Sequence, residues 1–98
     1  MLIQFRRVKM KAVITVTGKD GVGIVASISG LCAKYGVNIM DISQSVLQEF
    51  FVMFMIADIS GLTVPFTDFV DVAANYGKTV GLTVSVMHED IFNSMHKI

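Results

Sequence analysis

The spacing of hydrophobic residues near the N-terminus predicts a strand followed by a helix. Residues 11–17 alternate apolar and mixed positions, a period typical of a strand, and this strand is expected to end at Gly18. From Ile24 onwards the apolar residues recur at helical intervals, which predicts an amphipathic helix with a small or polar far face. Gly36 is expected to end that helix, because glycine is common just beyond a helix C-terminus.

The middle of the chain is typical of two strands in immediate succession. Residues 37–47 and 50–59 both carry strand patterns, and only Gln48 and Glu49 separate them. A connection this short is a hairpin, so the two strands are predicted to be antiparallel neighbours.

A second helix and a fourth strand complete the predicted order. Pro65 stands at the start of this helix and Gly77 at its end, and a strand over residues 82–88 follows. A short C-terminal helical turn is expected from Glu89. The order βαββαβ predicts an α+β, ferredoxin-like fold: a four-stranded antiparallel sheet with two helices on one face.

The third predicted strand is hydrophobic on both faces, since residues 50–57 are eight consecutive apolar residues. One alternating set packs on the helices, and burying the other set is worth roughly 6–12 kcal/mol. The pattern leaves open which set faces the helices: Phe50, Val52, Phe54 and Ile56, or Phe51, Met53, Met55 and Ala57. We expect a homodimer, through sheet faces or sheet edges, to cover the second set. The alternative is that the C-terminal segment folds back over that face.

The composition agrees with an excess of apolar surface on one small domain. The chain has 98 residues, of which 53% are hydrophobic and 16% charged, and its mean hydropathy is +0.65. The formal net charge is zero, but Arg6, Arg7 and Lys9 lie at the N-terminus and leave five basic residues against eight acidic ones. This net charge of −3 argues against a nucleic-acid partner.

The chain ends and the single cysteine indicate where the protein works. Residues 1–9 are expected to be an N-terminal extension, disordered or upstream of an alternative start at Met10, and residues 10–98 to form one domain. The sequence has no apolar run of about 18 residues and no secretory signal, so no membrane partner is expected. Cys32 lies on an apolar helical stripe and is predicted to be a buried structural thiol. We therefore expect a cytoplasmic protein.

The glycine-rich loop before the first helix matches a nucleotide-binding pattern in its letters. Gly21 to Ala26 read G-x-G-x-x-A, and an acid, Asp41, follows twenty positions after Gly21. A dinucleotide fold continues with a further helix and a parallel strand, whereas here a hairpin follows the second strand. Asp20 would also place negative charge beside a pyrophosphate. Topology and charge together argue against a nucleotide.

An acylphosphatase-like enzyme is a minor alternative, because those enzymes share the βαββαβ order and a phosphate loop after the first strand. The arginine that must balance the phosphoryl charge would fall at Val25, and no arginine lies beyond Arg7. The catalytic cation is therefore missing, and no enzyme activity is expected.

The third interpretation of the loop is recognition of a small amino acid by the protein backbone. Asp20 is suited to cap the first helix, while Gly21 and Gly23 allow a ligand to approach the main chain closely. A helix start with free N–H groups binds a carboxylate as readily as a phosphate. The plain alternative is a glycine-rich turn that only caps the helix.

The stretch VTGKDGVGIVASISGLCAKYGVNIMDIS resembles the start of an ACT domain, in which a strand, a D-x-x-G loop, a helix and G-x-N-I follow in that order. The tail VGLTVSVMHEDIFNSMHKI narrows the resemblance to small UPF0237-type proteins, and it covers about residues 10–98. The resemblance implies a regulatory, dimeric module that binds a small amino acid or related metabolite where the loop of one chain faces the second strand of its partner. A protein-interaction module without a bound ligand is the alternative. The ligand-binding residues implied are Asp20, Gly21, Val22, Gly23, Ile24, Asn38 and Ile39.

Other candidate chemistry is weak. His88, Glu89, Asp90 and His96 lack a recognised metal-ligand spacing, so neither a metal nor a cofactor is expected. The serines of the first helix and second strand have no nearby histidine to activate them, and no catalytic residue is predicted.

Overall fold

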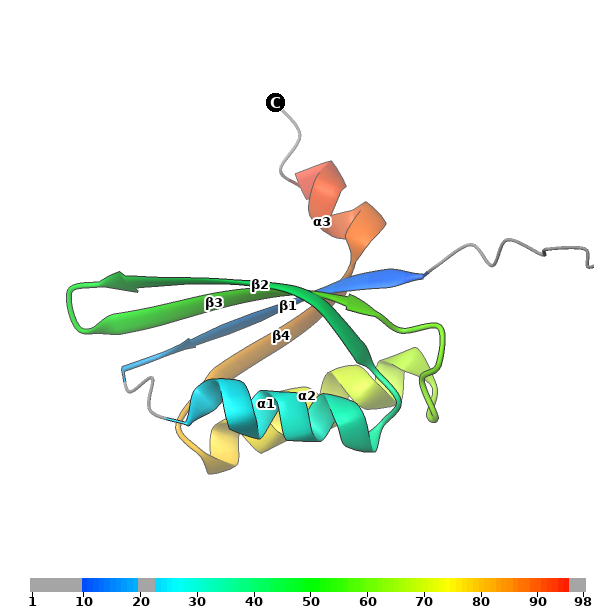
Figure 1. Cartoon of the computed structure of the whole chain (residues 1–98), viewed down its shortest axis with the longest axis horizontal. Helices are drawn as coiled ribbons and strands as arrows, with labels where there is room; N and C mark the ends of the chain where they lie inside the picture. The colour runs from blue at the N-terminus through cyan, green and yellow to red at the C-terminus, as the bar shows by residue number, and fades with distance from the viewer. Residues whose placement is uncertain (1–9, 20–22, 96–98) are drawn as a thin grey trace, which may run out of the picture.

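The computed structural model of the protein describes residues 10–19 and 23–95, so the predicted extension over residues 1–9 lies outside the described residues. The chain forms four strands and three helices in these parts (Figure 1). In chain order they are β1 (Lys11–Gly18), α1 (Ile24–Lys34), β2 (Asn38–Leu47), β3 (Phe50–Asp58), α2 (Phe66–Thr79), β4 (Thr83–His88) and α3 (Glu89–Met95).

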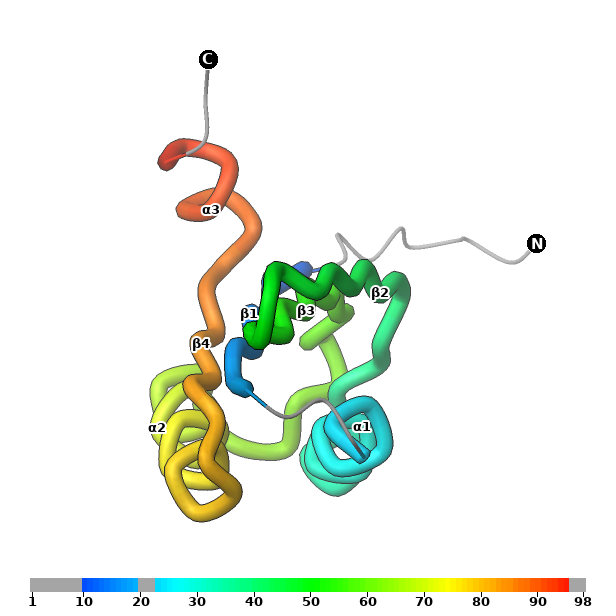
Figure 2. The backbone as a smooth tube through the Cα atoms, turned by 90° about the vertical axis from the view of Figure 1, so that its left-hand side faces the viewer, coloured from blue at the N-terminus to red at the C-terminus, as the bar shows by residue number. Residues whose placement is uncertain are grey.

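The strands form one antiparallel sheet in the order β2-β3-β1-β4. Helices α1 and α2 both cover one face of this sheet, α1 on the side of β2 and α2 on the side of β4 (Figure 2). The predicted ferredoxin-like fold, with its hairpin between β2 and β3, is therefore confirmed. Gln48 makes the tight turn of this hairpin with a φ of 56°.

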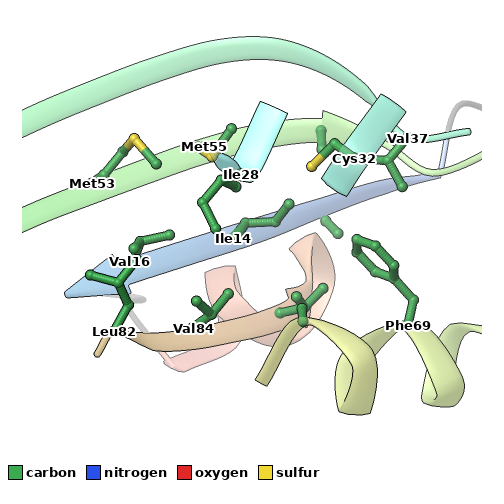
Figure 3. Close-up of a cluster of buried hydrophobic side chains, with 14 of the residues drawn as sticks. Ile14, Val16, Ile28, Cys32, Val37, Met53, Met55, Phe69, Leu82 and Val84 are labelled. Atoms are coloured by element: carbon green, nitrogen blue, oxygen red, sulfur yellow. The ribbon is translucent and has the colours of Figure 1, made fainter. Parts of the chain in front are cut away.

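The core lies between the sheet and these two helices. Ile14 and Val16 of β1 meet Met53 and Met55 of β3 across the ladder, and all four are almost fully buried (Figure 3). Phe69 of α2 is fully buried. Its ring makes an edge-on contact with the ring of Tyr35, with the centroids 5.9 Å apart.

The structure decides which apolar set of β3 faces the helices. The set that begins at Phe51 is buried beneath α1 and α2, whereas the set that begins at Phe50 lies on the opposite, helix-free face. On that face Phe50 keeps 48% of its surface exposed and Phe54 keeps 41%. The described chain therefore leaves part of the second set uncovered.

Helix α1 ends as predicted, but α2 does not. Gly36 follows α1 with a φ of 76°, a conformation that favours glycine. Gly77, which was expected to end the second helix, is buried inside α2, and the helix continues to Thr79. The prediction was wrong because this glycine serves close packing: a Cβ at Gly77 would lie 2.8 Å from the carbonyl oxygen of Leu82.

The C-terminal helix α3 confirms the predicted helical turn from Glu89. It stands on the helix-free side of the sheet and contacts β1 and β4 (Figure 1). Val13, on this face of β1, is only 2% exposed. Because Phe50 and Phe54 stay exposed, α3 does not provide the full cover that the alternative of a folded-back C-terminal segment required.

Candidate functional site

The predicted ligand residues fall in two places. Asp20, Gly21 and Val22 lie outside the described residues. Gly23 and Ile24 form the start of α1. Asn38 and Ile39, the remaining predicted pair, begin β2.

Gly23 occupies the N-cap position of α1, the position for which Asp20 was predicted. Its φ of 73° is left-handed, and an added Cβ would meet nothing within 4 Å. No side-chain hydrogen bond caps this helix within the described residues, and its first turn holds no acidic residue. Among the described residues, the N–H groups of this first turn therefore have no side-chain acceptor, and the helix dipole there favours a negative charge.

Ile24 differs from its glycine neighbour because its side chain belongs to the core. It is 3% exposed and packs with the other buried residues beneath the sheet. Only the backbone of Ile24 is therefore suited to contact a ligand.

Asn38 is exposed, and it pairs with Asp58 at the beginning of the β2–β3 ladder. Ile39 is half-buried against the core, so its side chain is a packing group. The register shifts between Ile39 and Asp41, where Met40 is accommodated as a bulge. The amide of Asn38 is thus an exposed polar side chain that this end of β2 offers to a ligand.

Gly23 and Asn38 do not come together within one chain. They lie at opposite ends of α1, whose 11 residues span about 16 Å at 1.5 Å per residue. Figure 1 shows the start of α1 and the start of β2 at the two ends of the helix. An amino acid is too short to touch both, so a site that uses both needs a second chain.

Strand β2 is an edge of the sheet and is strongly exposed along its length. An edge strand presents a row of unpaired N–H and C=O groups, which can pair with the edge of another chain. The exposed side chains of β2 are mostly small and polar over residues 41–45. This edge can therefore accept a second strand without steric obstruction from large side chains.

The structure also bears on the alternative chemistries. Strands β2 and β3 are antiparallel and Asp41 lies within β2, so the fold is not that of a dinucleotide-binding domain. Val25, where an acylphosphatase would need its arginine, is a residue of α1.

Among the weak metal-ligand candidates, His88 makes a ring contact with Phe66 at 4.4 Å between centroids. Within residues 10–19 and 23–95, no three metal-binding side chains cluster.

Sequence reasoning missed a surface depression of about 490 Å³ beside the β2–β3 hairpin. We call it the notch: residues 17–19 at the end of β1, Phe50 at the start of β3, and residues 80–83 between α2 and β4 line it. No local sequence signal marks it, because three segments far apart in the chain enclose it.

In the described part of the chain, none of the helices has the length and apolar character to cross a membrane.

Comparisons with known proteins give one consistent family. A family model described as ACT domain matches residues 11–67. A UPF0237 protein of Clostridium acetobutylicum is 44% identical over 89 residues, covering 91% of this chain and 100% of that protein. A UPF0237 protein of Pyrobaculum aerophilum is 47% identical over 87 residues, covering 89% and 97%. A solved structure, an ACT domain protein from Streptococcus pneumoniae, has a TM-score of 0.76 at 42% identity and covers 86% and 94%.

Proposed function

The chain belongs to the ACT domain family, as a UPF0237-type member, and we propose that it is a non-enzymatic regulatory protein that binds a small amino acid between two copies of itself. The observation that carries this proposal is the placement of Gly23 and Asn38 at opposite ends of α1, next to the exposed edge of β2.

The site has two parts, which we call the half-sites: the start of α1 at Gly23 and the side chain of Asn38 at the start of β2. Two-fold pairing of β2 with the β2 strand of a second copy would bring a half-site of each kind together across the interface. In an antiparallel pair, the start of one strand lies beside the end of the other. Helix α1 lies under the β2 side of the sheet, so pairing would also set the two α1 helices side by side and antiparallel (Figure 2). The start of α1 in one copy would then face Asn38 of the other copy.

The two half-sites differ in the chemistry they offer. The open helix start at Gly23 suits the carboxylate of an amino acid, because backbone N–H groups and the helix dipole favour a negative charge there. The side-chain amide of Asn38 supplies a donor and an acceptor, so its oxygen can accept a hydrogen bond from the ammonium group. A zwitterion matches this pair better than a phosphate does, because the described part of the site contributes no positively charged side chain.

A binding screen tests the proposal. Each common amino acid is added to the wild-type protein and to Asn38→Ala, and binding is followed by the shift in melting temperature and by calorimetry. At least one amino acid is expected to stabilise the wild type, by an amount that grows with ligand concentration. Asn38→Ala should lose most of this shift.

Asn75→Ala is the matched control, because Asn75 is exposed on α2, which packs at the opposite edge of the sheet, against β4. It should keep the full response. If no amino acid stabilises the wild type, the sensing role is wrong and an interaction module without a ligand becomes the better account. If Asn38→Ala and Asn75→Ala respond alike, the ligand binds elsewhere than between the two half-sites.

A further inference from the structure

The chain turns sharply between the end of α1 and the start of β2, over residues 35–38, which we call the corner. Tyr35 is the C-cap of α1, and Gly36 follows with a φ of 76°. The N–H of Val37 then donates a hydrogen bond of 2.8 Å back to a carbonyl oxygen of the helix. Asn38, the next residue, begins β2, so the corner decides where this asparagine stands.

The side-chain amide of Asn38 is held by the backbone alone. It makes no hydrogen bond with the described residues of the chain. Its place therefore depends on the corner before it and on the pairing of Asn38 with Asp58 in the β2–β3 ladder. A ligand that binds this amide gains affinity when the corner is fixed in advance, because less order has to be created on binding.

Thr63 contacts the corner with three of its groups. Its N–H donates a hydrogen bond of 3.0 Å to the carbonyl oxygen of Tyr35, and its hydroxyl donates one of 3.3 Å to the same oxygen. Its methyl group lies over Gly36, since a Cβ added there would be 3.3 Å from Cγ2 of Thr63. The connection from β3 to α2, which contains Thr63, lies at the same end of the molecule as the start of β2 (Figure 1).

The backbones of the corner and of this connection also touch directly. A Cβ on Gly61 would lie 3.0 Å from the carbonyl oxygen of Gly36, and a Cβ on Gly36 would overlap the carbonyl oxygen of Gly61. On its other side the corner is anchored in the core, where the ring of Tyr35 contacts that of Phe69. The connection from β3 to α2 therefore closes the outer side of the corner.

We propose that Thr63 is a positioning residue of the amino-acid site: its hydrogen bonds to the Tyr35 carbonyl hold the corner, and with it the amide of Asn38, in the conformation that binds the ligand. Thr63 has this role in binding only if the proposed function holds, but its contacts lie within one chain and need no second copy. Thr63 is exposed, so its hydroxyl acts on the conformation of the corner rather than on the core. If its loss lowers the binding-competent fraction to about a fifth, the apparent affinity falls about fivefold.

Three substitutions separate this role from a general effect on folding. Thr63→Val removes the hydroxyl and keeps the shape and the N–H, whereas Thr63→Ser keeps the hydroxyl. Thr79→Val is the matched control, because the hydroxyl of Thr79 donates a hydrogen bond of 2.7 Å to the carbonyl oxygen of Tyr76. It removes the same kind of bond from the end of α2, which packs against β4.

Hydrogen exchange without any amino acid tests the hold on the corner. The amides of Val37 and Leu82 are matched reporters, since each donates a 2.8 Å hydrogen bond to a carbonyl oxygen five positions earlier, at the ends of α1 and α2. Thr63→Val is expected to speed exchange at Val37 about fivefold and to leave Leu82 within about twofold of the wild type. Thr63→Ser and Thr79→Val should leave Val37 within about twofold. An unchanged rate at Val37, or equal acceleration of both amides in Thr63→Val, would overturn the proposal.

Calorimetric titration with each of the twenty common amino acids tests the effect on binding, at a temperature where all variants are folded. An amino acid that binds the wild type should bind Thr63→Val about fivefold more weakly, and Thr63→Ser and Thr79→Val within about twofold. Wild-type affinity in Thr63→Val would overturn the role in binding, as would a Thr63→Ser variant as weak as Thr63→Val. If no amino acid binds the wild type, the proposed function fails, and the role of Thr63 in binding fails with it. The exchange rates then still decide whether Thr63 holds the corner.

Discussion

The backbone of Gly77 in α2 lies directly against the segment that leads into β4: the amide N–H of Leu82 donates a hydrogen bond of 2.8 Å to the carbonyl oxygen of Gly77. A Cβ on Gly77 would lie 2.7 Å from Cγ2 of Val84 and 2.8 Å from the carbonyl oxygen of Leu82. We expect Gly77→Ala to lower the free energy of unfolding by about 1–3 kcal/mol, because the helix must move away from β4. Urea denaturation measures this change.

Gly30→Ala is the matched control, because Gly30 lies inside α1 and an added Cβ would meet nothing within 4 Å. Alanine is the better helix former, so this variant should raise the free energy of unfolding by about 0.5–1 kcal/mol. A Gly77→Ala variant as stable as Gly30→Ala would show that α2 and β4 are packed less closely than described.

Phe69 should be among the most sensitive core positions. It is fully buried, and its ring contacts that of Tyr35. Phe69→Ala is expected to cost about 3–5 kcal/mol of unfolding free energy, from lost burial and the cavity left behind. The exposed Asn75→Ala on the same helix should change stability by less than about 0.5 kcal/mol. Comparable losses in the two variants would be incompatible with the core assigned to α2.

Burial raises the pKa of the Cys32 thiol from 9.0 to about 11. Below pH 9 the thiol is neutral in both the folded and unfolded states, and it has no effect on the pH dependence of stability. Between about pH 9 and 11 the unfolded chain releases this proton first, so unfolding becomes easier as pH rises. Wild type should therefore lose stability over this interval more steeply than Cys32→Ala, as measured by denaturation at several pH values.

Substitution of Gly23 tests the backbone conformation at the start of α1, because an added side chain does not disturb the packing. Its φ of 73° is unfavourable for residues with a Cβ, although the space around it is empty. Gly23→Ala is expected to cost about 1–2 kcal/mol of unfolding free energy, and Gly23→Asn clearly less, because asparagine tolerates this conformation. Thermal unfolding in the absence of any amino acid separates this backbone effect from an effect on binding. Equal stability of all three proteins would mean that this residue changes conformation freely.

Most of the fold could be predicted from the local pattern of apolar residues, but the end of α2 could not. The hairpin at Gln48 and Glu49 follows from two strand patterns with only two residues between them, and β2 and β3 pair accordingly. The end of α2 was predicted wrongly because glycine serves two purposes that look alike in a sequence. Gly36 adopts a left-handed conformation beyond a helix, whereas Gly77 allows a helix to approach a strand.

The candidate site could be predicted only as a set of residue types. The open backbone at Gly23 and the amide of Asn38 are both recognisable from the sequence, but their separation is not, because it depends on the length and direction of α1. The notch could not be predicted at all, since the end of β1, Phe50 and residues 80–83 meet only when the sheet is assembled.

The sequence by itself determined the order of the elements, the hairpin and the two-sided hydrophobicity of β3, because these depend on periodicity between near neighbours. The tertiary structure alone decided that Phe51 faces the helices while Phe50 faces away, since eight consecutive apolar residues satisfy either register equally well. It also decided that α3 stands on the helix-free side of the sheet, against β1 and β4. Contacts between distant segments depend on how the strands assemble into a sheet. The periodicity of hydrophobic residues along the chain does not specify this assembly.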